Sequence, residues 1–386
     1  MHYIRLLRSP QLVRVPGALR LELLVTITTD LGDSFLQTAD TVILQVTAFV
    51  KTPTGTAGYV LGAKDATLQW RPSARVAKPV LDIPKPVLQA LVAKQQVEIC
   101  VAPSDSSFIA SSIGNILAAP THGQIMPAWT TLAAKPIGPS ALRRRIIITH
   151  SQNDYIEVEE EIGESIARHI WDAGVLSLCS IVSSIAVPSL PAARDPCMKA
   201  VYKTLQAGAN ILELGCGVGI LGIGIAQVLR QSHMKHSSTL LMTDLDEAQE
   251  RAESNIHMLS QRNSGKTNVC VEYENLDWEK GRIGDFTDKV RASAWDLIIL
   301  SDCTYNADML PALVETLSAI HESNQRVKGS AKTQVFMATK PRHDSERAFF
   351  SLLDKEHWKA VHKQIIPLPV IEAEAQTIEM YLFEKI

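Results

Sequence analysis

A glycine-rich turn in the middle of the chain has the residue types and spacing of a cofactor-binding loop. Residues 211–214 have the pattern of a buried strand end, and Gly215, Gly217 and Gly219 follow at alternate positions before a helix predicted to start near Leu221. Glycine suits such a turn because it adopts backbone angles that strain other residues and lets a ligand approach the main chain. In a doubly wound α/β sheet, nucleotide-like cofactors bind at a turn of this kind.

The spacing of these glycines argues against a dinucleotide site. The dinucleotide fingerprint G-x-G-x-x-G would require a third glycine at position 220, where the chain has Ile220. An acid, Glu213, also stands two residues before the first glycine. Its carboxylate would repel a pyrophosphate but suits the cationic methionine end of S-adenosylmethionine. The turn therefore predicts an S-adenosylmethionine site.

The next predicted strand, residues 239–243, ends at a second acid, Asp244. A carboxylate at this place can accept hydrogen bonds from both ribose hydroxyls of a bound nucleoside. The polar stretch 231–238 reads as an inserted loop that lengthens the distance from the glycine turn. The alternative is that Asp244 caps the following helix, since Glu247 lies three residues later as in a capping box.

From the strand at 210–214 onward, short apolar strands alternate with helices, which predicts a parallel sheet covered by helices on both faces. Two final strands joined by a short loop predict an antiparallel hairpin at the sheet's edge. We predict a Rossmann-like seven-stranded methyltransferase fold in the α/β class. The predicted strands are 210–214, 239–243, 268–272, 296–300, 333–338, 360–366 and 377–383, and the predicted helices are 221–230, 246–261, 311–323 and 345–355.

The first hundred residues have a different pattern, rich in β-branched residues and turn residues. Segments 21–29, 41–49 and 96–101 predict strands, and Asp30–Ser34 between the first two predicts a turn. Small polar residues and prolines follow. We predict a separate N-terminal β-rich module over 1–102, a linker over 103–144 and the S-adenosylmethionine-dependent methyltransferase domain over 145–386.

Composition excludes few classes but favours an ordinary globular protein. The net charge of −3 gives no reason to expect nucleic acid as a partner, and the one basic cluster, Arg143–Arg145, reads as a solvated linker edge. The six cysteines show no metal-ligand spacing, so we predict reduced thiols and no metal. No secretory signal or membrane span is predicted. These features predict a cytoplasmic protein, with the nucleus as the alternative.

At this point five segments together resemble the seven-β-strand protein-lysine N-methyltransferase family, which includes enzymes acting on elongation factors and chaperones. The D-x-x-Y motif of that family matches Asp302–Tyr305, and the wording of the motif is similar to fungal members that carry an N-terminal extension. The resemblance covers about 240 residues and leaves the N-terminal module outside. The first segment is 170–174, the second consists of the cofactor motifs 213–219 and 243–245 with 255–256, and the others are 276–278, 302–305, and 340–342 with Glu346 and 349–350.

The resemblance implies further cofactor contacts. Asp277 would accept a hydrogen bond from the adenine amino group, and Trp278 would pack against the adenine ring, a common use of an aromatic face. Trp171 would line the methionine end, and Ser301 would border the cofactor mainly through its backbone. The alternatives are that Trp278 is a core aromatic and that Trp171 anchors a helix. A run of acids before Trp171, at 157–161, reads as a solvated edge.

Methyl transfer to a lysine needs a group that orients the amine and a partly desolvated channel, because the free amine has a pKa of about 10.4. Asp302 and Tyr305 follow the fourth strand, where the sheet opens onto the cofactor cleft. We predict that Asp302 holds the ammonium and that Tyr305 shapes the channel; water can take the proton. The alternative is that Asp302 caps the helix after this strand and Tyr305 is merely packed.

The predicted function is S-adenosylmethionine-dependent methyl transfer to a lysine of a cytosolic protein, such as a translation elongation factor, by a monomeric enzyme without nucleic-acid or membrane partners. Two alternatives remain. A small-molecule N-methyltransferase would have an enclosed, aromatic-lined acceptor pocket, since the fold alone does not determine the substrate. A scaffold protein would keep the fold but not bind the cofactor. The N-terminal module would serve recognition, docking or stability.

Overall fold

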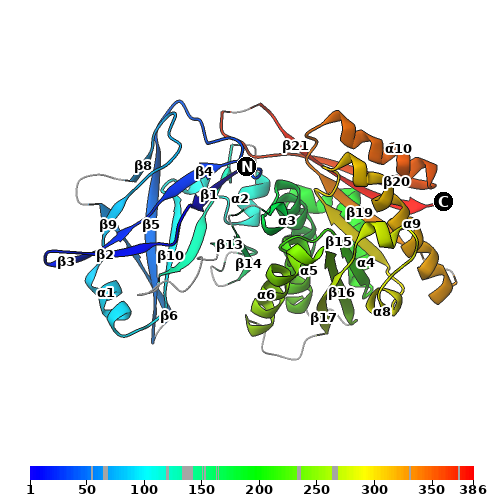
Figure 1. Cartoon of the computed structure of the whole chain (residues 1–386), viewed down its shortest axis with the longest axis horizontal. Coiled ribbons are helices and arrows are strands. Elements are labelled where there is room, and N and C mark those ends of the chain that lie inside the picture. Colours follow the sequence, from blue (N-terminus) through cyan, green and yellow to red (C-terminus); the bar gives the residue numbers. More distant parts are fainter. Residues whose placement is uncertain are drawn as a thin grey trace. The chain divides into compact units, whose positions relative to one another are not determined.

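The computed structural model shows two compact units (Figure 1). The first unit consists of Met1–Ile147, Glu159–Glu164 and Pro369–Ala375, and the second of Ile148–Val158, Ser165–Leu368 and Gln376–Ile386. The residues that the structure describes are 1–53, 55–63, 68–118, 121–132, 142–149, 151, 154–161, 163, 165–232, 236–262, 268–329, 332–372 and 374–386.

Among the described residues, seven strands form the sheet of the second unit, in the order β17-β16-β15-β18-β19-β21-β20. The first five in this order are parallel, and β21 runs antiparallel to both β19 and β20. The order reverses at β15, next to β18, which is the topological switch point where ligands bind in such sheets. The strands are β15 (Asn210–Leu214), β16 (Ser238–Asp244), β17 (Val269–Asn275), β18 (Leu297–Ser301), β19 (Gln334–Thr339), β20 (Trp358–Pro367) and β21 (Thr377–Lys385).

This sheet is the predicted seven-stranded α/β fold. The central strands β15 and β18 are almost fully buried, as near-continuous apolar runs in a parallel sheet should be. Alternate residues of β15 face opposite sides of the sheet. Leu212 and Leu214 belong to one apolar core together with Leu313 and Phe349 of the helices on that side.

Helices cover both faces of the sheet (Figure 1). On one side α7, α9 and α10 pack together, and on the other α3 packs against α4 and α5. The α-helices are α3 (Asp172–Ala186), α4 (Pro196–Gln206), α5 (Ile220–Gln231), α6 (Asp246–Arg262), α7 (Trp278–Gly281), α8 (Asp288–Arg291), α9 (Leu310–Val327) and α10 (Ala348–Lys355). The 3-10 helices are η2 (Ile166–Arg168), η3 (Pro191–Arg194), η4 (Ala307–Met309) and η5 (Asp344–Arg347).

Helix α3 is the most buried helix of the second unit. With the preceding turn, it is the one helical segment of the described residues that is long and apolar enough to cross a membrane, and 78% of its most apolar window is buried inside the protein. Gly224 of α5 lies directly against Leu178 of α3, so the two helices approach closely at this glycine. These features identify α3 as a core helix.

The first unit is β-rich, as its sequence predicts, with mostly antiparallel pairing. Its described strands form three sheets, ordered β11-β1-β4, β2-β3-β9-β7 and β13-β12-β10-β5-β6, with β8 also paired to β5. The strands are β1 (His2–Leu6), β2 (Gln11–Val15), β3 (Ala18–Glu22), β4 (Val25–Thr28), β5 (Val42–Thr52), β6 (Gly55–Val60), β7 (Gly62–Ala63), β8 (Leu68–Trp70), β9 (Val80–Asp82), β10 (Val97–Pro103), β11 (Ile125–Met126), β12 (Ala128–Leu132) and β13 (Leu142–Ile147). Its helices are α1 (Lys85–Val92), η1 (Ser106–Phe108) and α2 (Ile113–Ala118).

The segment 103–144 is not a linker where the structure describes it, which corrects the sequence prediction. It contains η1, α2, β11, β12 and the start of β13, and residues 119–120 and 133–141 lie outside the described residues. The antiparallel pairing of β12 with β10, from Val97 to Val101, makes this segment part of the main sheet of the first unit. The small residues and prolines of this segment are typical of a loop. Its short strands are stabilised by partners that are distant in sequence, which a local pattern does not reveal.

Two charged runs that the sequence predicts to be solvated, 143–145 and 157–161, contain buried charged side chains that form ion pairs. Arg144 of β13 and Glu160 of β14 (Tyr155–Glu160) form an ion pair of 2.6 Å in which both side chains are almost fully buried. In the second unit, Glu157 is buried and lies 3.8 Å from Arg262. A strand buries alternate residues, so consecutive charges on one strand cannot all face solvent when one of its faces is covered.

Candidate cofactor and acceptor site

The glycine turn lies between β15 and α5, at the switch point of the sheet. The backbone angle φ is +64° at Gly215, +53° at Gly217 and +81° at Gly219, so all three residues are in the left-handed region. Side-chain-bearing residues adopt this region at a cost of about 1–2 kcal/mol. The alternate spacing of the glycines in the sequence therefore follows from the path of the backbone.

The surroundings of the turn also leave no space for a β-carbon. A β-carbon on Gly215 would lie 2.7 Å from the Cys303 sulfur, and one on Gly219 would collide with the Met242 methyl group. A β-carbon on Gly217 would lie 3.0 Å from the carbonyl oxygen of Ala167 in η2. The turn is thus tightly packed by β16, by the loop after β18 and by the segment before α3.

Asp244 at the end of β16 holds the glycine turn in place. Its carboxylate accepts hydrogen bonds of 2.7 Å from the backbone N–H groups of Gly217 and Leu245, one on each oxygen. Each oxygen keeps a further lone pair, which is what a ribose diol requires. Burial raises the pKa of Asp244, partly offset by these two hydrogen bonds. Asp244 does not cap α6 as the alternative proposed. Helix α6 begins at Asp246, and among the described residues the Asp244 carboxylate accepts only the two hydrogen bonds named above.

Asn255 of α6 is a second brace that the sequence analysis quoted only as part of a motif. Its side-chain amide is buried and donates a hydrogen bond of 2.8 Å to the carbonyl oxygen of Val218. The backbone N–H of Cys216 is held in turn by the carbonyl oxygen of Thr243, at 3.0 Å. A buried asparagine in an otherwise apolar helix stripe was the available signal, because buried amides are nearly always hydrogen-bonded.

Glu213 lies under the turn rather than at its surface. Only 2% of the residue is exposed, and its Oε2 atom lies beside Gly222 of α5 without a well-aligned hydrogen bond to any described residue. Burial raises the pKa of this carboxyl group to about 8, although the backbone N–H of Gly222 lowers it in part. An unsatisfied buried carboxyl oxygen beside the turn is consistent with a site that receives positive charge.

The structure places Trp278 next to the turn and Asp277 at a helix start. Atom Cζ2 of the Trp278 ring lies 3.3 Å from the β-carbon position of Gly215, so this ring borders the turn while it also packs on the apolar core. Asp277 caps α7, with one oxygen accepting a hydrogen bond of 2.9 Å from the Glu279 N–H. The half-buried Asp277 keeps its second carboxyl oxygen available for the predicted adenine contact.

The segment before α3 lies over the other side of the turn. Trp171 precedes the first residue of α3, and its indole N–H donates to the carbonyl oxygen of Ile166 at 3.2 Å. Ser301 ends β18, where its hydroxyl lies 3.4 Å from the β-carbon position of Gly174. Both predicted residues are therefore near the start of α3, and Trp171 also has an anchoring contact, as the alternative proposed.

Asp302 is placed differently from the prediction. Its side chain is only 3% exposed and forms an ion pair of 2.8 Å with Arg342. The same carboxylate accepts hydrogen bonds of 3.1 Å from the backbone N–H groups of Ala173 and Lys340. Asp302 therefore caps α3, not the helix after β18, and its charge is already neutralised. This corrects the prediction that Asp302 binds the ammonium directly; the residue holds other elements in position.

Tyr305, the last residue of the D-x-x-Y motif, faces solvent and is 59% exposed. Between Asp302 and Tyr305, the side chains of Cys303 and Thr304 are both buried, and each contacts a different part of the protein. The Cys303 sulfur contacts the glycine turn, and the Thr304 hydroxyl donates to Glu346 at 3.2 Å. The loop 301–305 therefore connects the cofactor turn to a second region, and Tyr305 lies at the exposed end of it.

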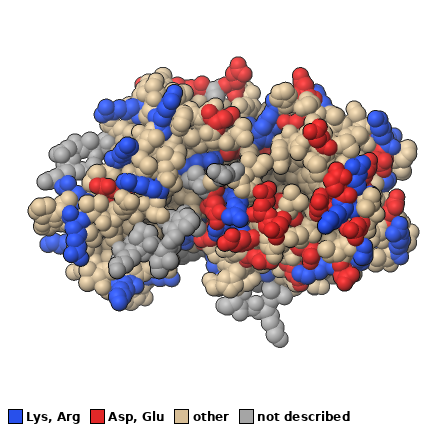
Figure 2. All heavy atoms as spheres, viewed as in Figure 1, with Lys and Arg blue, Asp and Glu red and all other residues tan. Residues whose placement is uncertain are grey.

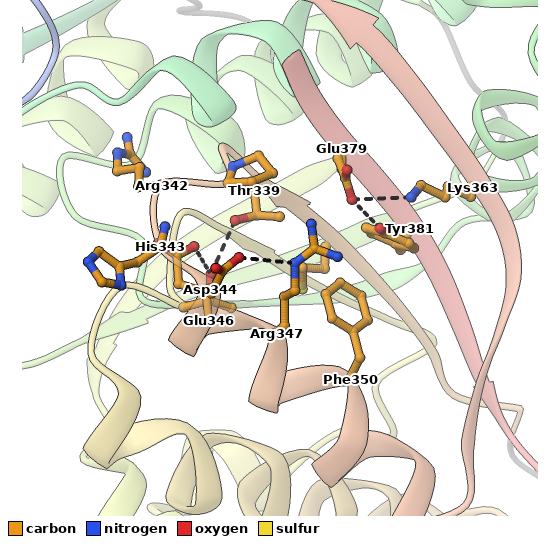
Figure 3. Close-up of a pocket in the computed structure, with 13 residues that line it drawn as sticks. Thr339, Arg342, His343, Asp344, Glu346, Arg347, Phe350, Lys363, Glu379 and Tyr381 are labelled. Carbon is orange, nitrogen blue, oxygen red and sulfur yellow. Dashed lines mark hydrogen bonds and ion pairs between the residues drawn. The ribbon is translucent and has the colours of Figure 1, made fainter. Parts of the chain in front are cut away.

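That second region is a cavity of about 660 Å³ at the carboxyl ends of β18 and β19 (Figure 3). Figure 3 shows the charged side chains and the Phe350 and Tyr381 rings around it. It opens to the surface, because Asp344 and Arg347 at its edge are largely exposed. The lining residues are Thr304, Met337, Thr339, Pro341, Arg342, His343, Asp344, Glu346, Arg347, Phe350, Lys363, Glu379 and Tyr381.

No group of three His, Cys, Asp or Glu side chains in the described part of the chain is placed to hold a metal ion. The cysteines are free thiols, and all but Cys270 are buried. Burial also raises the pKa of the Cys216 and Cys303 thiols beside the turn, which keeps them protonated and unreactive at neutral pH.

Comparison with known proteins decides the family. A family model described as lysine methyltransferase matches residues 150–356, which is more than half of the chain. The chain belongs to the lysine methyltransferase family. The match includes the glycine turn, Asp244, the loop 301–305 and the cavity-lining residues up to Phe350, whereas Lys363, Glu379 and Tyr381 of the cavity lie beyond it. This family assignment makes the chain an S-adenosylmethionine-dependent methyltransferase.

Individual relatives of this lysine methyltransferase cover different parts of it. A protein of the UPF0665 family from Schizosaccharomyces pombe is 28% identical over 91% of this chain and 92% of its own length. Protein N-lysine methyltransferase METTL21A from Danio rerio is 24% identical over 49% of this chain and 67% of its own. A solved SAM-dependent methyltransferase from Methanosarcina mazei is 13% identical, covers 48% of this chain and 97% of that one, and has a TM-score of 0.35.

The residues around the turn fit S-adenosylmethionine. Three glycines hold the turn in left-handed backbone angles at the switch point of the sheet, Asp244 has acceptor capacity for a diol, and the Glu213 Oε2 atom lies beneath the turn. When bound, the cofactor supplies a methyl group on a sulfonium. The glycine turn and Asp244 would hold the cofactor, and Trp278 would border it, because its ring lies beside the turn.

Proposed function

We propose that this methyltransferase acts on the side-chain amine of a lysine in a folded protein. The observation that carries the proposal is the open, charged cavity beside the loop 301–305, in a chain of the lysine methyltransferase family. Charged residues at the exposed edge suit a protein surface, whereas a small-molecule acceptor favours an enclosed apolar pocket. The relative METTL21A, a protein N-lysine methyltransferase by name, supports the same acceptor class.

The reaction needs little covalent help from the protein. The neutral amine nitrogen forms the new N–C bond while the sulfur–methyl bond breaks and its electron pair stays on sulfur; a proton of the amine passes to water. Positioning of the amine in line with the methyl group is the main catalytic contribution. Tyr305, exposed at the end of the loop that contacts the glycine turn, is the residue that we propose to shape the amine's approach.

We further propose a translation elongation factor as the first substrate to test, on the resemblance of the D-x-x-Y motif. We also propose a cytoplasmic, monomeric enzyme. Nucleic acid is not the proposed partner. On the face drawn in Figure 2, basic side chains are separated from one another by other residues and form no continuous patch such as a phosphate backbone requires.

The proposal is tested by incubating the enzyme with tritiated S-adenosylmethionine and a fission yeast protein extract. We expect label in protein, and after acid hydrolysis in methylated lysine. A parallel reaction with purified elongation factors tests the narrower substrate. Label confined to small molecules would support the small-molecule alternative, and an enzyme that does not bind S-adenosylmethionine in calorimetry would support the scaffold alternative.

A further inference from the structure

Glu346 in η5 is a carboxylate at the inner side of the cavity, and only 8% of the residue is exposed. Its two oxygens accept hydrogen bonds of 3.2 Å from neutral donors, the Thr304 hydroxyl and the backbone N–H of His343. No cation of the described residues forms an ion pair with it. A buried carboxylate without a cation costs free energy unless a ligand or partner supplies one.

The three basic side chains that line the cavity do not neutralise Glu346, because each already forms an ion pair with another acid. Arg342 pairs with Asp302 at 2.8 Å, Arg347 with Asp344 at 3.7 Å, and Lys363 with Glu379 at 3.2 Å. The lining carries three basic and three acidic side chains, and Glu346 is the acid of the lining that pairs with none of these cations. A carboxylate without an ion pair at the buried end of an open cavity favours a cationic ligand there.

The walls of the cavity also suit a cationic side chain. The rings of Phe350 and Tyr381 lie side by side, with centroids 4.9 Å apart. The ammonium of Lys363 already lies 4.8 Å from the centroid of the Tyr381 ring, so this wall is one over which a cation is stable. The planar guanidinium of an arginine, or an ammonium group, fits between such rings and a carboxylate.

The cavity is adjacent to the reacting centre but separate from it. The lining includes Thr304 but none of the glycine turn, Asp302 or Tyr305. Consecutive residues bridge the two places, since the Cys303 sulfur touches the glycine turn and the Thr304 hydroxyl bonds to Glu346. Cys303 and Thr304 are consecutive, with Cα atoms about 3.8 Å apart, so the cavity lies directly beside the loop that contacts the glycine turn.

We propose that this cavity is a specificity subsite that takes a basic side chain of the protein substrate, an arginine or lysine neighbouring the methylated lysine, with Glu346 as its counter-ion. This inference rests on the proposed protein-lysine activity. It gives Glu346 a role in substrate affinity, whereas methyl transfer itself does not require the residue.

The test compares the wild-type enzyme with Glu346→Gln, which removes the charge and keeps one of the two accepting oxygens. Initial rates of tritium transfer are measured over dilutions of the fission yeast extract. We expect KM to rise about tenfold or more, so that kcat/KM falls by the same factor. The kcat and the affinity for S-adenosylmethionine should stay within about twofold of wild type. Glu346→Asp should recover part of the loss. The control, Asp354→Asn, removes an exposed acid of α10 outside the cavity and should change nothing.

The second step maps the labelled lysine by mass spectrometry and replaces each neighbouring basic residue of that substrate by glutamine. One replacement should lower the wild-type rate by the same factor as Glu346→Gln and have no further effect on that variant. An unchanged KM in Glu346→Gln, a loss in kcat instead, or a labelled lysine without a basic neighbour that matters would each overturn the subsite. Absence of any lysine label with the wild-type enzyme would instead refute the proposed function.

Discussion

Three glycines at 215–219 adopt left-handed backbone angles, and a β-carbon on each would lie 3.0 Å or less from a neighbouring atom. Two independent requirements, the backbone angle and the available space, therefore favour glycine at the same positions. The bracing side chains Asp244 and Asn255 hydrogen-bond to the turn at Gly217 and Val218, between the first and last glycine. A residue-scale change in the turn should consequently affect cofactor binding before it affects the rest of the fold.

Gly217→Arg should weaken S-adenosylmethionine binding by about 100-fold or more, a loss of about 2.7 kcal/mol. The new side chain must adopt a φ of +53° and displace the Ala167 carbonyl of η2. Isothermal titration calorimetry measures the affinity. Gly329→Arg is the matched control, since a β-carbon there meets no atom within 4 Å, and it should bind like wild type. Equal affinity of Gly217→Arg and wild type would show that the cofactor does not bind at this turn.

At the scale of elements, Asp302 joins three parts of the second unit. It follows β18, caps the N-terminus of α3 at Ala173, and holds Lys340 and Arg342 after β19. Lys340 in turn pairs with Asp172, the first residue of α3, at 2.8 Å. The carboxyl ends of the central strands are therefore tied to the helix that precedes the cofactor turn, and the D-x-x-Y motif begins with a positioning residue.

Asp302→Ala should lower the free energy of unfolding by about 2–3 kcal/mol, because it leaves a partly buried arginine without its acid and α3 without its cap. Chemical denaturation of the variant measures this loss. Asp354→Ala, at an exposed position of α10, should change the stability by no more than about 0.5 kcal/mol. If Asp302→Ala were as stable as wild type and lost only activity, the original interpretation of Asp302 as an ammonium ligand would be restored.

At the scale of the whole molecule, the buried acid Glu213 connects the cofactor site to the pH dependence of stability. Burial raises its pKa from 4.5 to about 8. The folded protein therefore retains a proton that the unfolded chain releases, and between these two values stability falls as pH rises, by up to about 1.4 kcal/mol per pH unit. The free-energy cost of ionising Glu213 therefore arises at the glycine turn itself, where a cationic ligand would reduce it.

Glu213→Gln should remove that pH dependence. Its melting temperature, relative to wild type, should rise progressively from about pH 5 to about pH 8, because the variant no longer holds a titrating group in this position. Differential scanning calorimetry at several pH values measures the difference. Asp246→Asn, which changes an exposed acid at the start of α6, serves as the control. Parallel melting curves for Glu213→Gln and wild type across this range would contradict the buried, proton-retaining state of Glu213.

Much of the catalytic fold could be predicted from the sequence because its signals are local. Apolar runs such as Asn210–Leu214 identify buried strands, the alternation with helices implies a parallel sheet, and the spacing of the glycines reflects three left-handed backbone angles. The same locality explains the error at 103–144, where short strands pair with distant partners and the local pattern is that of a loop.

The chemical state of the acids was decided only by the tertiary structure. Asp302 meets Ala173 and Arg342, which are 129 and 40 residues away, and Glu346 meets Thr304, 42 residues away. Local spacing contains no information on which acid finds a cation at such distances, so sequence analysis selected Asp302, whose charge is neutralised. Folding leaves Glu346 without a cation beside an open cavity, because long-range packing determines both the burial of a charge and its partner.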